Sequence, residues 1–366
     1  MHKVLLVGGA GYVGSVLAQE LLERGCAVRV LDRLFYGDRG LAGVRDRVEL
    51  VVADMRRVEP SQLAGVDAIV NVGGLSNDPT AEYNPTANHE MNTVAAVRLA
   101  ELGRAAGIRR YVLASSCSIY DRGGANDHDD IVYDEAADVH PRAAYATSKY
   151  EAERRVLAMA GPDFCPVVLR KATVFGYSPR LRFDLVVNTF VKDALTTGTI
   201  TLFRGGEMWR PLVDVRDVAR AYIACIGADE VTVRGQVFNV AACNMRISEL
   251  GLRVRTTLRD LGLTVDLRAD YGYRAVRSYR VGTQKIERVL GFKAVISVED
   301  AVRDLVTQLR QSSIEDLNDP RYDNLRWLRL LEEAEAILGT GRSVFDAPSD
   351  GQPVRLTVAS GRRAER

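Results

Sequence analysis

The N-terminal segment has the pattern of a strand, a glycine turn and a helix. Residues 4–7 are an apolar run, and residues 15–25 carry apolar side chains at helical spacing before ending on a glycine. Three glycines fall at the turn, where missing side chains permit a tight reversal and let a diphosphate approach backbone N–H groups. This order predicts a dinucleotide-binding unit. The turn residues expected to line it are Gly8, Gly11, Tyr12, Val13 and Gly14.

The next predicted strand ends in an acidic residue. Residues 27–31 are strand-like, and Asp32 follows at about the distance where a carboxylate accepts hydrogen bonds from the adenine ribose. A carboxylate there repels a 2′-phosphate, which favours NAD over NADP, and the adjoining Arg33 softens that preference. The alternative is a glycine turn followed by a solvated Asp. The complete order of strand, turn, helix, strand and acid favours the cofactor site.

Further along, strand-like and helix-like segments alternate. Residues 48–52, 66–72 and 111–114 have strand patterns, and residues 93–106 have a helical one. The expected fold class is α/β, with a doubly wound parallel sheet of the Rossmann type. Ligands of such sheets bind at the carboxyl ends of the strands, so residues from several strand ends should share one crevice. Those expected there, besides the glycine turn, are Asp32, Asp54, Met55, Gly73, Gly74, Ser115 and Ser116.

A tyrosine and a lysine stand four residues apart after a polar loop. Residues 145–159 have a helical pattern, which places Tyr145 and Lys149 one turn apart on the same face. An ammonium nearby and a positive nicotinamide ring would favour the phenolate, so Tyr145 could take a proton from a substrate hydroxyl. Ser116 would hold the hydroxyl oxygen. The alternative, a pair on a helix surface, is less favoured because this pair follows a dinucleotide fold and a strand ending in two serines.

Composition excludes several function classes. The 366 residues carry a net charge of +1 and are 47% hydrophobic, so neither disorder nor a nucleic-acid partner is expected. No apolar run is long enough to cross a membrane, and the chain enters a strand at once, which leaves no room for a signal peptide. We therefore expect a cytoplasmic protein with no membrane partner. The five cysteines and four histidines have no ligand spacing, so no metal site is expected.

Taken together, these residues resemble the extended short-chain dehydrogenases/reductases, specifically the NAD-dependent sugar epimerase/dehydratase group. The resemblance covers roughly residues 3–310. The residues that carry it are Gly8, Gly11, Gly14, Asp32, Asp54, Asn92, Ser115-Ser116-Cys117-Ser118-Ile119-Tyr120, Tyr145 and Lys149. It implies that Asn92 helps to hold NAD and that Gly73 and Gly74 replace small alanines against the dinucleotide. It also implies a homodimer, in which residues 93–106 and the Tyr145 helix pair with their copies.

The resemblance also implies a division of the chain. Residues 1–175 would form the NAD-binding domain, rejoined by about 212–242, and residues 176–338 would mainly form a smaller α/β domain that binds a nucleotide sugar. Composition predicts a flexible tail over residues 340–366. Arg210 is the leading candidate for a phosphate ligand. The other expected substrate contacts are Ser76, Ser116, Ser118, Thr173, Arg180, Arg182, Asn188 and Arg277.

The residues after the catalytic serine bear on the reaction. Dehydratases and decarboxylases of this group carry Asp-Glu or Ser-Glu there, whereas this chain has Cys117 and Ser118. A cysteine beside Ser116 points to the opposite face of a strand, so Cys117 is expected to pack rather than to act as a base. The leading hypothesis is an NAD-dependent epimerase acting at C4 through a transient 4-keto intermediate. The alternatives are an NAD(P)H-dependent 4-keto-sugar reductase, a dehydratase and a non-enzymatic NAD-sensing protein.

Overall fold

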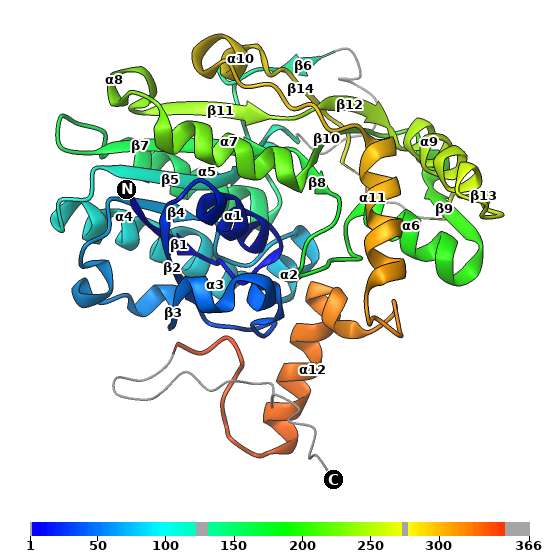
Figure 1. The fold of residues 1–366 in the computed structure, drawn as a ribbon, viewed down its shortest axis with the longest axis horizontal. Coiled ribbons are helices and arrows are strands. Elements are labelled where there is room, and N and C mark those ends of the chain that lie inside the picture. Colours follow the sequence, from blue (N-terminus) through cyan, green and yellow to red (C-terminus); the bar gives the residue numbers. More distant parts are fainter. Residues whose placement is uncertain (1, 122–130, 273–276, 348–366) are drawn as a thin grey trace.

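The fold is described from a computed structural model, which defines residues 2–121, 131–272 and 277–347. Its largest element is a seven-stranded parallel sheet in the order β11-β7-β5-β4-β1-β2-β3 (Figure 1). The prediction of a doubly wound Rossmann-type sheet is therefore confirmed. The strands are β1 (Lys3–Val7), β2 (Ala27–Asp32), β3 (Val48–Val52), β4 (Ala68–Asn71), β5 (Arg110–Ser116), β7 (Cys165–Lys171) and β11 (Gln236–Val240).

Helices cover both faces of this sheet. On one face, α1 (Tyr12–Glu23) and α7 (Val215–Gly227) lie side by side and bury their apolar stripes with the strands in one cluster (Figure 1). On the other face, α4 (Ala95–Ala105) and α5 (Ala144–Leu157) pack in a second cluster. The period of about 3.6 residues that puts apolar side chains on one stripe explains why these segments are helices here.

The strand order reverses between β1 and β4, because β2 and β3 continue from one side of β1 and β4 and β5 from the other. Loops on either side of such a reversal diverge and leave a crevice at the carboxyl ends of the strands. The pairing of β5 with β7 sets Ser116 opposite Lys171 at this edge. The fold thus brings the ends of β1, β2, β4, β5 and β7 around one opening.

A second, smaller group of elements lies beside the carboxyl edge of the sheet. Its core is an apolar cluster formed by three helices and short strands. The helices are α6 (Val186–Thr197), α9 (Ile247–Asp260) and α11 (Val298–Gln311). The strands form small sheets: β8 (Thr173–Phe175), β10 (Trp209–Asp214) and β12 (Cys243–Arg246); and β9 (Thr199–Phe203) and β13 (Asp266–Asp270). A further pair, β6 (Val132–Tyr133) and β14 (Arg280–Val281), buries Tyr133 and Val281 in the cluster of α1 and α7 instead.

Shorter helices connect these parts. A turn of π-helix over Glu90–Val94 precedes α4, which explains why the helix expected from residue 93 is regular only from Ala95. None of the described helices is long and apolar enough to cross a membrane. The remaining α-helices before the C-terminal region are α2 (Asp78–Tyr83), α3 (Pro85–His89), α8 (Glu230–Val233) and α10 (Gln284–Leu290).

The C-terminal helix α12 (Asn324–Ile337) extends below the loops after β2 and β4 in Figure 1. Leu328 and Leu331 of α12 are buried in a cluster that also contains Val344 and Phe345. These two apolar side chains fall within the predicted flexible tail, where burial against α12 removes them from water. The flexibility of the tail stays a prediction. Residues 348–366 lie outside the described part of the chain.

Candidate active site

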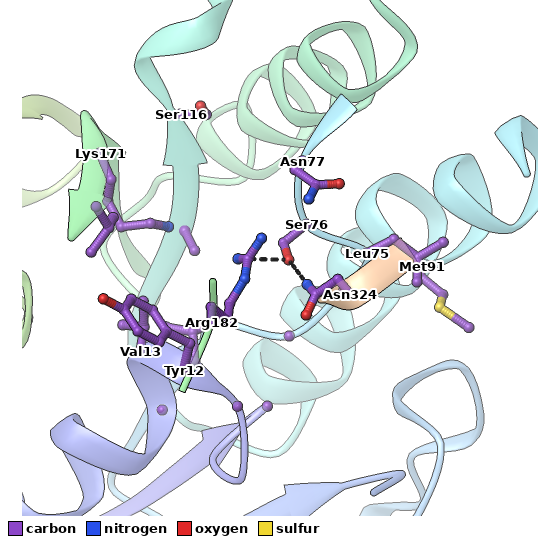
Figure 2. Close-up of a pocket in the computed structure, with 18 of the residues that line it drawn as sticks. Tyr12, Val13, Leu75, Ser76, Asn77, Met91, Ser116, Lys171, Arg182 and Asn324 are labelled. Carbon is purple, nitrogen blue, oxygen red and sulfur yellow. Dashed lines mark hydrogen bonds between the residues drawn. The ribbon is translucent and has the colours of Figure 1, made fainter. Parts of the chain in front are cut away.

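A cavity follows the carboxyl edge of the sheet and continues toward the smaller group of elements (Figure 2). Most residues predicted from the sequence meet in its wall. They are Gly8, Gly11, Tyr12, Val13, Gly14, Asp32, Arg33, Asp54, Met55, Gly73, Gly74, Ser76, Ser116, Ser118, Tyr145, Lys149, Thr173, Arg180, Arg182 and Arg277. The residues predicted to be catalytic and, apart from Asn92, those predicted to bind the cofactor thus share one cavity with most of the expected substrate contacts.

The glycine turn has no room for side chains. A Cβ atom at Gly14 would lie 2.1 Å from the carbonyl oxygen of Gly8, and one at Gly8 would lie 2.6 Å from Cα of Gly73. Gly8 also has a φ of 80°, which residues with a side chain rarely adopt. The helix that follows has Gly11 at its N-cap and no side-chain cap, so its first N–H groups remain available to an anion.

The end of the cavity next to β2 carries both expected carboxylates. Asp32 accepts hydrogen bonds from the backbone N–H of Ala10 and Leu34, at 3.0 and 2.8 Å, and burial raises its pKa. Asp54 behaves differently. Burial alone would raise its pKa, but hydrogen bonds and charge from Arg56 and the charge of Arg33 lower the pKa below its ordinary value. Both acids are therefore held in place by protein donors.

Arg33 is already bound on both sides of its guanidinium. Nη1 donates to Asp54 at 2.9 Å and Nη2 donates to the carbonyl of Val344 at 2.7 Å. The group also lies over the ring of Phe35, at 4.6 Å from the centroid. The expected softening of the preference for NAD requires a guanidinium free to meet a 2′-phosphate. These contacts hold Arg33 against Asp54 and the C-terminal segment instead.

Ser116, Tyr145 and Lys149 line the opposite end. The Ser116 hydroxyl donates to Oγ of Ser118 at 2.9 Å and accepts from the backbone N–H of Ser118 at 3.1 Å. On α5, Nζ of Lys149 lies 5.9 Å from the centroid of the Tyr145 ring. Lys149 is 6% exposed, and burial lowers its pKa to about 8. The three groups are placed as hydroxyl-binding and proton-transferring groups would be.

The ionisation of Tyr145 differs from the expectation based on Lys149. Burial raises the pKa of Tyr145 to about 12, and the negative charge of Asp78 adds to this effect. Arg182, Arg277 and a hydrogen bond with Ser116 act in the opposite direction but do not outweigh burial. The expected preference for the phenolate is therefore not produced by the protein groups alone. An additional positive charge in the cavity would be needed to lower this pKa.

The four arginines predicted as phosphate ligands differ in their partners. Arg182 forms a two-pronged ion pair with Asp184, at 2.8 and 2.7 Å, and Arg277 is paired with Asp78. Within the described residues, no carboxylate lies within 4.0 Å of Arg180. Arg182 and Arg277 therefore line the cavity with their charges neutralised by carboxylates. Arg180 lines it without such an ion pair among the described residues.

Three predicted residues, Asn188, Arg210 and Asn92, are not among those that line the cavity. Asn188 is fully buried, and its amide forms hydrogen bonds with the backbone of Gly176 and Arg182. Arg210 donates to the carbonyls of Trp209 and Arg277. The roles of Asn188 and Arg210 as substrate contacts stay predictions. These side chains satisfy neighbouring backbone groups, which the sequence pattern does not reveal.

Asn92 supports the cavity from behind Gly74. Its Nδ2 donates to the carbonyl of Leu75 at 2.8 Å, and a Cβ atom at Gly74 would lie 2.0 Å from its Oδ1. A residue with a side chain at position 74 would therefore clash with Asn92. The Oδ1 atom of Asn92 is buried and has no hydrogen-bond partner among the described residues.

Sequence reasoning did not identify several lining residues. Lys171 ends β7, and its Nζ donates to the carbonyl of Ser115 at 3.3 Å and to Oη of Tyr222 at 3.4 Å. Its position opposite Ser116 could have been inferred from the parallel register. Asn324 comes from α12, for which the sequence predicts a helix but no packing partner. The other lining residues missed include Phe35, Tyr36, Leu75, Asn77 and Tyr279.

The residues present fit a dinucleotide. Besides the bare glycine turn, a buried Oγ of Ser115 and the Oδ1 of Asn92 have no hydrogen-bond partner among the described residues. Lys149 likewise makes no hydrogen bond or ion pair with the described residues, and Gly74 faces its amino group. Unpaired polar groups around a cavity are costly unless a ligand satisfies them. Gly8 to Gly14 would hold the diphosphate, Asp32 the adenine ribose and Lys149 the nicotinamide ribose.

Comparison with known proteins identifies a family model and several relatives that the chain resembles. Residues 4–241 match the family model described as the NAD dependent epimerase/dehydratase family. The chain is 28% identical over 233 residues to UDP-glucuronic acid decarboxylase 1 of Xenopus tropicalis, covering 62% of this chain and 54% of that protein. It is 26% identical over 232 residues to a putative UDP-glucose 4-epimerase of Methanocaldococcus jannaschii, covering 61% of this chain and 73% of that protein. The match thus spans about half the length of the first relative.

A solved structure extends the comparison to the fold. MoeE5 in complex with UDP-glucose and NAD superposes with a TM-score of 0.71 at 25% sequence identity. The superposition covers 84% of this chain and 99% of that chain, so part of this chain has no counterpart there. The family description and this neighbour both name NAD. The cofactor is NAD, as the glycine turn and Asp32 predict.

Proposed function

The chain belongs to the NAD-dependent epimerase/dehydratase family, and we propose that it is a nucleotide-sugar epimerase that inverts C4 through a transient 4-keto intermediate. The observation that carries the proposal is the set of groups at the end of the cavity beside β5. Ser116, Tyr145 and Lys149 line it, and among the described lining residues the only carboxylates are Asp32 and Asp54, at the other end. This set suffices to oxidise and reduce one hydroxyl.

Each protein group has a role in this proposal. Tyr145 accepts the proton of the sugar hydroxyl, and Ser116 donates a hydrogen bond to the same oxygen as it becomes a ketone. Lys149 holds the nicotinamide ribose and supplies positive charge beside the phenol. When bound, NAD supplies the hydride acceptor and later the hydride donor. The cycle involves no net oxidation because the hydride returns to the carbon it left, and Tyr145 ends the cycle in its starting protonation state because it returns the proton.

The residues after Ser116 support the epimerase over a dehydratase. Cys117 is fully buried, donates to the carbonyl of Arg170 at 3.0 Å, and burial raises its pKa, so it is neither acid nor base at neutral pH. Ser118 lines the cavity but carries no charge. An elimination requires a group that removes a proton from the carbon next to the ketone, and neither residue supplies one.

The substrate class follows from the arginines and from the relatives. Arg277 and Arg182 line the cavity beyond Tyr145, with Asp78 and Asp184 as partners that a diphosphate could replace or share. MoeE5 is solved with UDP-glucose, and the two relatives described above are named for UDP-sugars. We therefore propose a nucleoside diphosphate hexose, with UDP-glucose and UDP-glucuronic acid as the first compounds to test.

The test is a panel of UDP-, dTDP-, GDP-, CDP- and ADP-sugars incubated with purified protein without added cofactor. We expect one sugar nucleotide to reach equilibrium with its C4 epimer while total NADH stays constant. Consumption of added NADPH or NADH in proportion to product would instead indicate the reductase, and release of water or carbon dioxide would indicate a dehydratase or decarboxylase. NAD binding with no turnover across the panel would favour a sensor.

We also propose that the protein is a homodimer in which α4 and α5 pair with their copies. Light scattering on the eluting protein tests this directly, since a monomer mass at micromolar concentration would contradict it.

A further inference from the structure

Arg180 lines the cavity as a buried arginine without an acidic partner. Its side chain is 6% exposed, and no carboxylate among the described residues lies within 4.0 Å of it. Its guanidinium lies 4.0 Å from the centroid of the Tyr36 ring and donates to the carbonyl of Leu181 at 3.3 Å and to Oδ1 of Asn324 at 2.6 Å. Burial lowers its pKa to about 10, so it stays protonated at neutral pH. A buried cation is costly unless an anion accompanies it.

The position of Arg180 is at the dinucleotide end of the cavity. A Cβ atom at Gly40 would lie 2.5 Å from the carbonyl oxygen of Ala10 and 3.0 Å from Cβ of Arg180. Gly40 therefore lies between the glycine turn and Arg180 and contacts both. The charges of Asp184 and of Asp32 are both close enough to act on Arg180, which places it between the Arg182 pair and the end of β2. By contrast, Arg182 and Arg277 act on Tyr145, where the sugar is expected.

The C-terminal helix fixes this arginine. Asn324, the first residue of α12, accepts from Arg180 and donates from Nδ2 to Oγ of Ser76 at 2.8 Å. Arg182 donates to the same Ser76 oxygen at 3.1 Å, and Figure 2 shows Asn324, Ser76 and Arg182 joined in this way. One turn further along α12, Nε1 of Trp327 donates to the carbonyl of Phe35 at 2.7 Å. The helix is thus tied to the loops after β2 and β4.

We propose that Arg180 binds the diphosphate of NAD and that Asn324 is the residue that positions it. The guanidinium would add charge-assisted hydrogen bonds to those that the backbone N–H groups of the glycine turn provide. Asn324 lies outside residues 4–241, so the C-terminal helix contributes to a cofactor site that the family region does not complete. The sequence-based assignment of Arg180 to the substrate is replaced by this one. The proposal rests on NAD as cofactor and is independent of the reaction catalysed.

Calorimetry on protein freed of bound nucleotide tests the role of Arg180. We expect Arg180→Met to weaken ADP-ribose about tenfold to a hundredfold while adenosine, which lacks phosphates, binds as before. Arg180→Lys should recover part of the loss and also serves if the methionine variant folds poorly. An equal loss for adenosine and ADP-ribose would overturn the proposal in favour of a structural role. Unchanged ADP-ribose binding with weakened UDP binding would overturn it in favour of the substrate.

A double-mutant cycle tests Asn324. We expect Asn324→Leu to weaken ADP-ribose several-fold in the natural background and to have no further effect in Arg180→Met, because its action requires the arginine. Asn318→Ala is the matched control, since Asn318 precedes α12 and does not line the cavity. Equal losses in both backgrounds would contradict the positioning role and indicate that α12 acts only by packing.

Discussion

The two ends of the cavity are built differently. At the dinucleotide end much of the wall is backbone: a Cβ atom at Gly8 would meet Gly73 and one at Gly14 would meet Gly8, so neither position admits a side chain. At the sugar end the wall is made of long side chains, and Arg277 is held by Asp78, a residue remote in the sequence. A backbone wall depends on the local order of residues, whereas a side-chain wall depends on the assembled fold. The first can be inferred from spacing and the second cannot.

Tyr145 lies at the sugar end beside Ser116 and Lys149, and its substitution should have the largest effect. Tyr145→Phe deletes only the phenolic oxygen, so we expect turnover to fall about 10²- to 10⁴-fold while NAD binding stays within twofold. Steady-state rates and calorimetric titration with NAD measure the two quantities. Tyr150→Phe, on the same helix and with its ring beside Arg154, is the matched control and should keep full activity. Turnover retained in Tyr145→Phe would exclude the proposed proton transfer.

The backbone wall can be broken with one methyl group. Gly14→Ala would place Cβ 2.1 Å from the Gly8 carbonyl oxygen, so we expect loss of NAD binding and a loss of about 1–3 kcal/mol in the free energy of unfolding. In Gly43→Ala the added Cβ meets nothing within 4 Å, so it should bind NAD normally. Thermal melts with and without NAD distinguish these outcomes. Normal NAD binding by Gly14→Ala would refute the account of this turn.

A substitution in the side-chain wall should weaken substrate binding and leave NAD binding intact. We expect Arg277→Met to raise KM for the sugar nucleotide about tenfold to a hundredfold, since a charge-assisted contact is lost, and to leave NAD affinity unchanged. Initial rates over a range of substrate concentrations, together with NAD titration, test this. Arg288→Met on α10 removes a cation away from the cavity and serves as the control. Weakened NAD binding in Arg277→Met would contradict the assignment of this arginine to the sugar end of the cavity.

The sequence predicts the residues at strand ends and in the glycine turn better than the side chains whose partners depend on the assembled fold. The glycine turn, Asp32, Ser116, Tyr145 and Lys149 were expected in one crevice, and all line the cavity, because strand ends in a parallel sheet meet at one edge. Their roles stay predictions until tested. Arg210 and Asn188 do not line the cavity, because Arg210 donates to the remote carbonyl of Arg277 and Asn188 donates to that of Arg182. The residues 340–347 read as polar tail, although two apolar side chains within them are buried.

Asn324 illustrates the remaining limit. The apolar spacing of residues 322–338 predicts a helix, and α12 is found there. Nothing in that spacing indicates which loops the helix contacts, since its partners Ser76 and Arg180 are far away in the sequence. A cofactor site completed by a late helix is therefore visible only in the structure.

A smaller effect concerns Lys149 and pH. Its pKa is about 8 in the folded protein and about 10.5 when unfolded, so between these values the unfolded chain binds more protons and folding becomes more favourable as pH rises. We expect Lys149 to add about 1 kcal/mol between pH 7 and pH 9 in NAD-free protein. Lys171, with a pKa of about 7, acts in the same direction, so Lys149→Met should lose part of this gain. Denaturant unfolding at several pH values measures the free energy of unfolding. If this free energy rose equally with pH in the natural protein and in Lys149→Met, the burial of the Lys149 charge would be contradicted.

The most direct test of the central claim uses a sugar nucleotide carrying deuterium on C4. With purified protein and no added cofactor, the account predicts that the C4 epimer appears with its deuterium still on C4, because hydride leaves and returns within the same cavity. NMR of the product follows both the configuration and the label. Loss of deuterium from C4, or product formation only when NADH or NADPH is supplied, would contradict a redox-neutral epimerase.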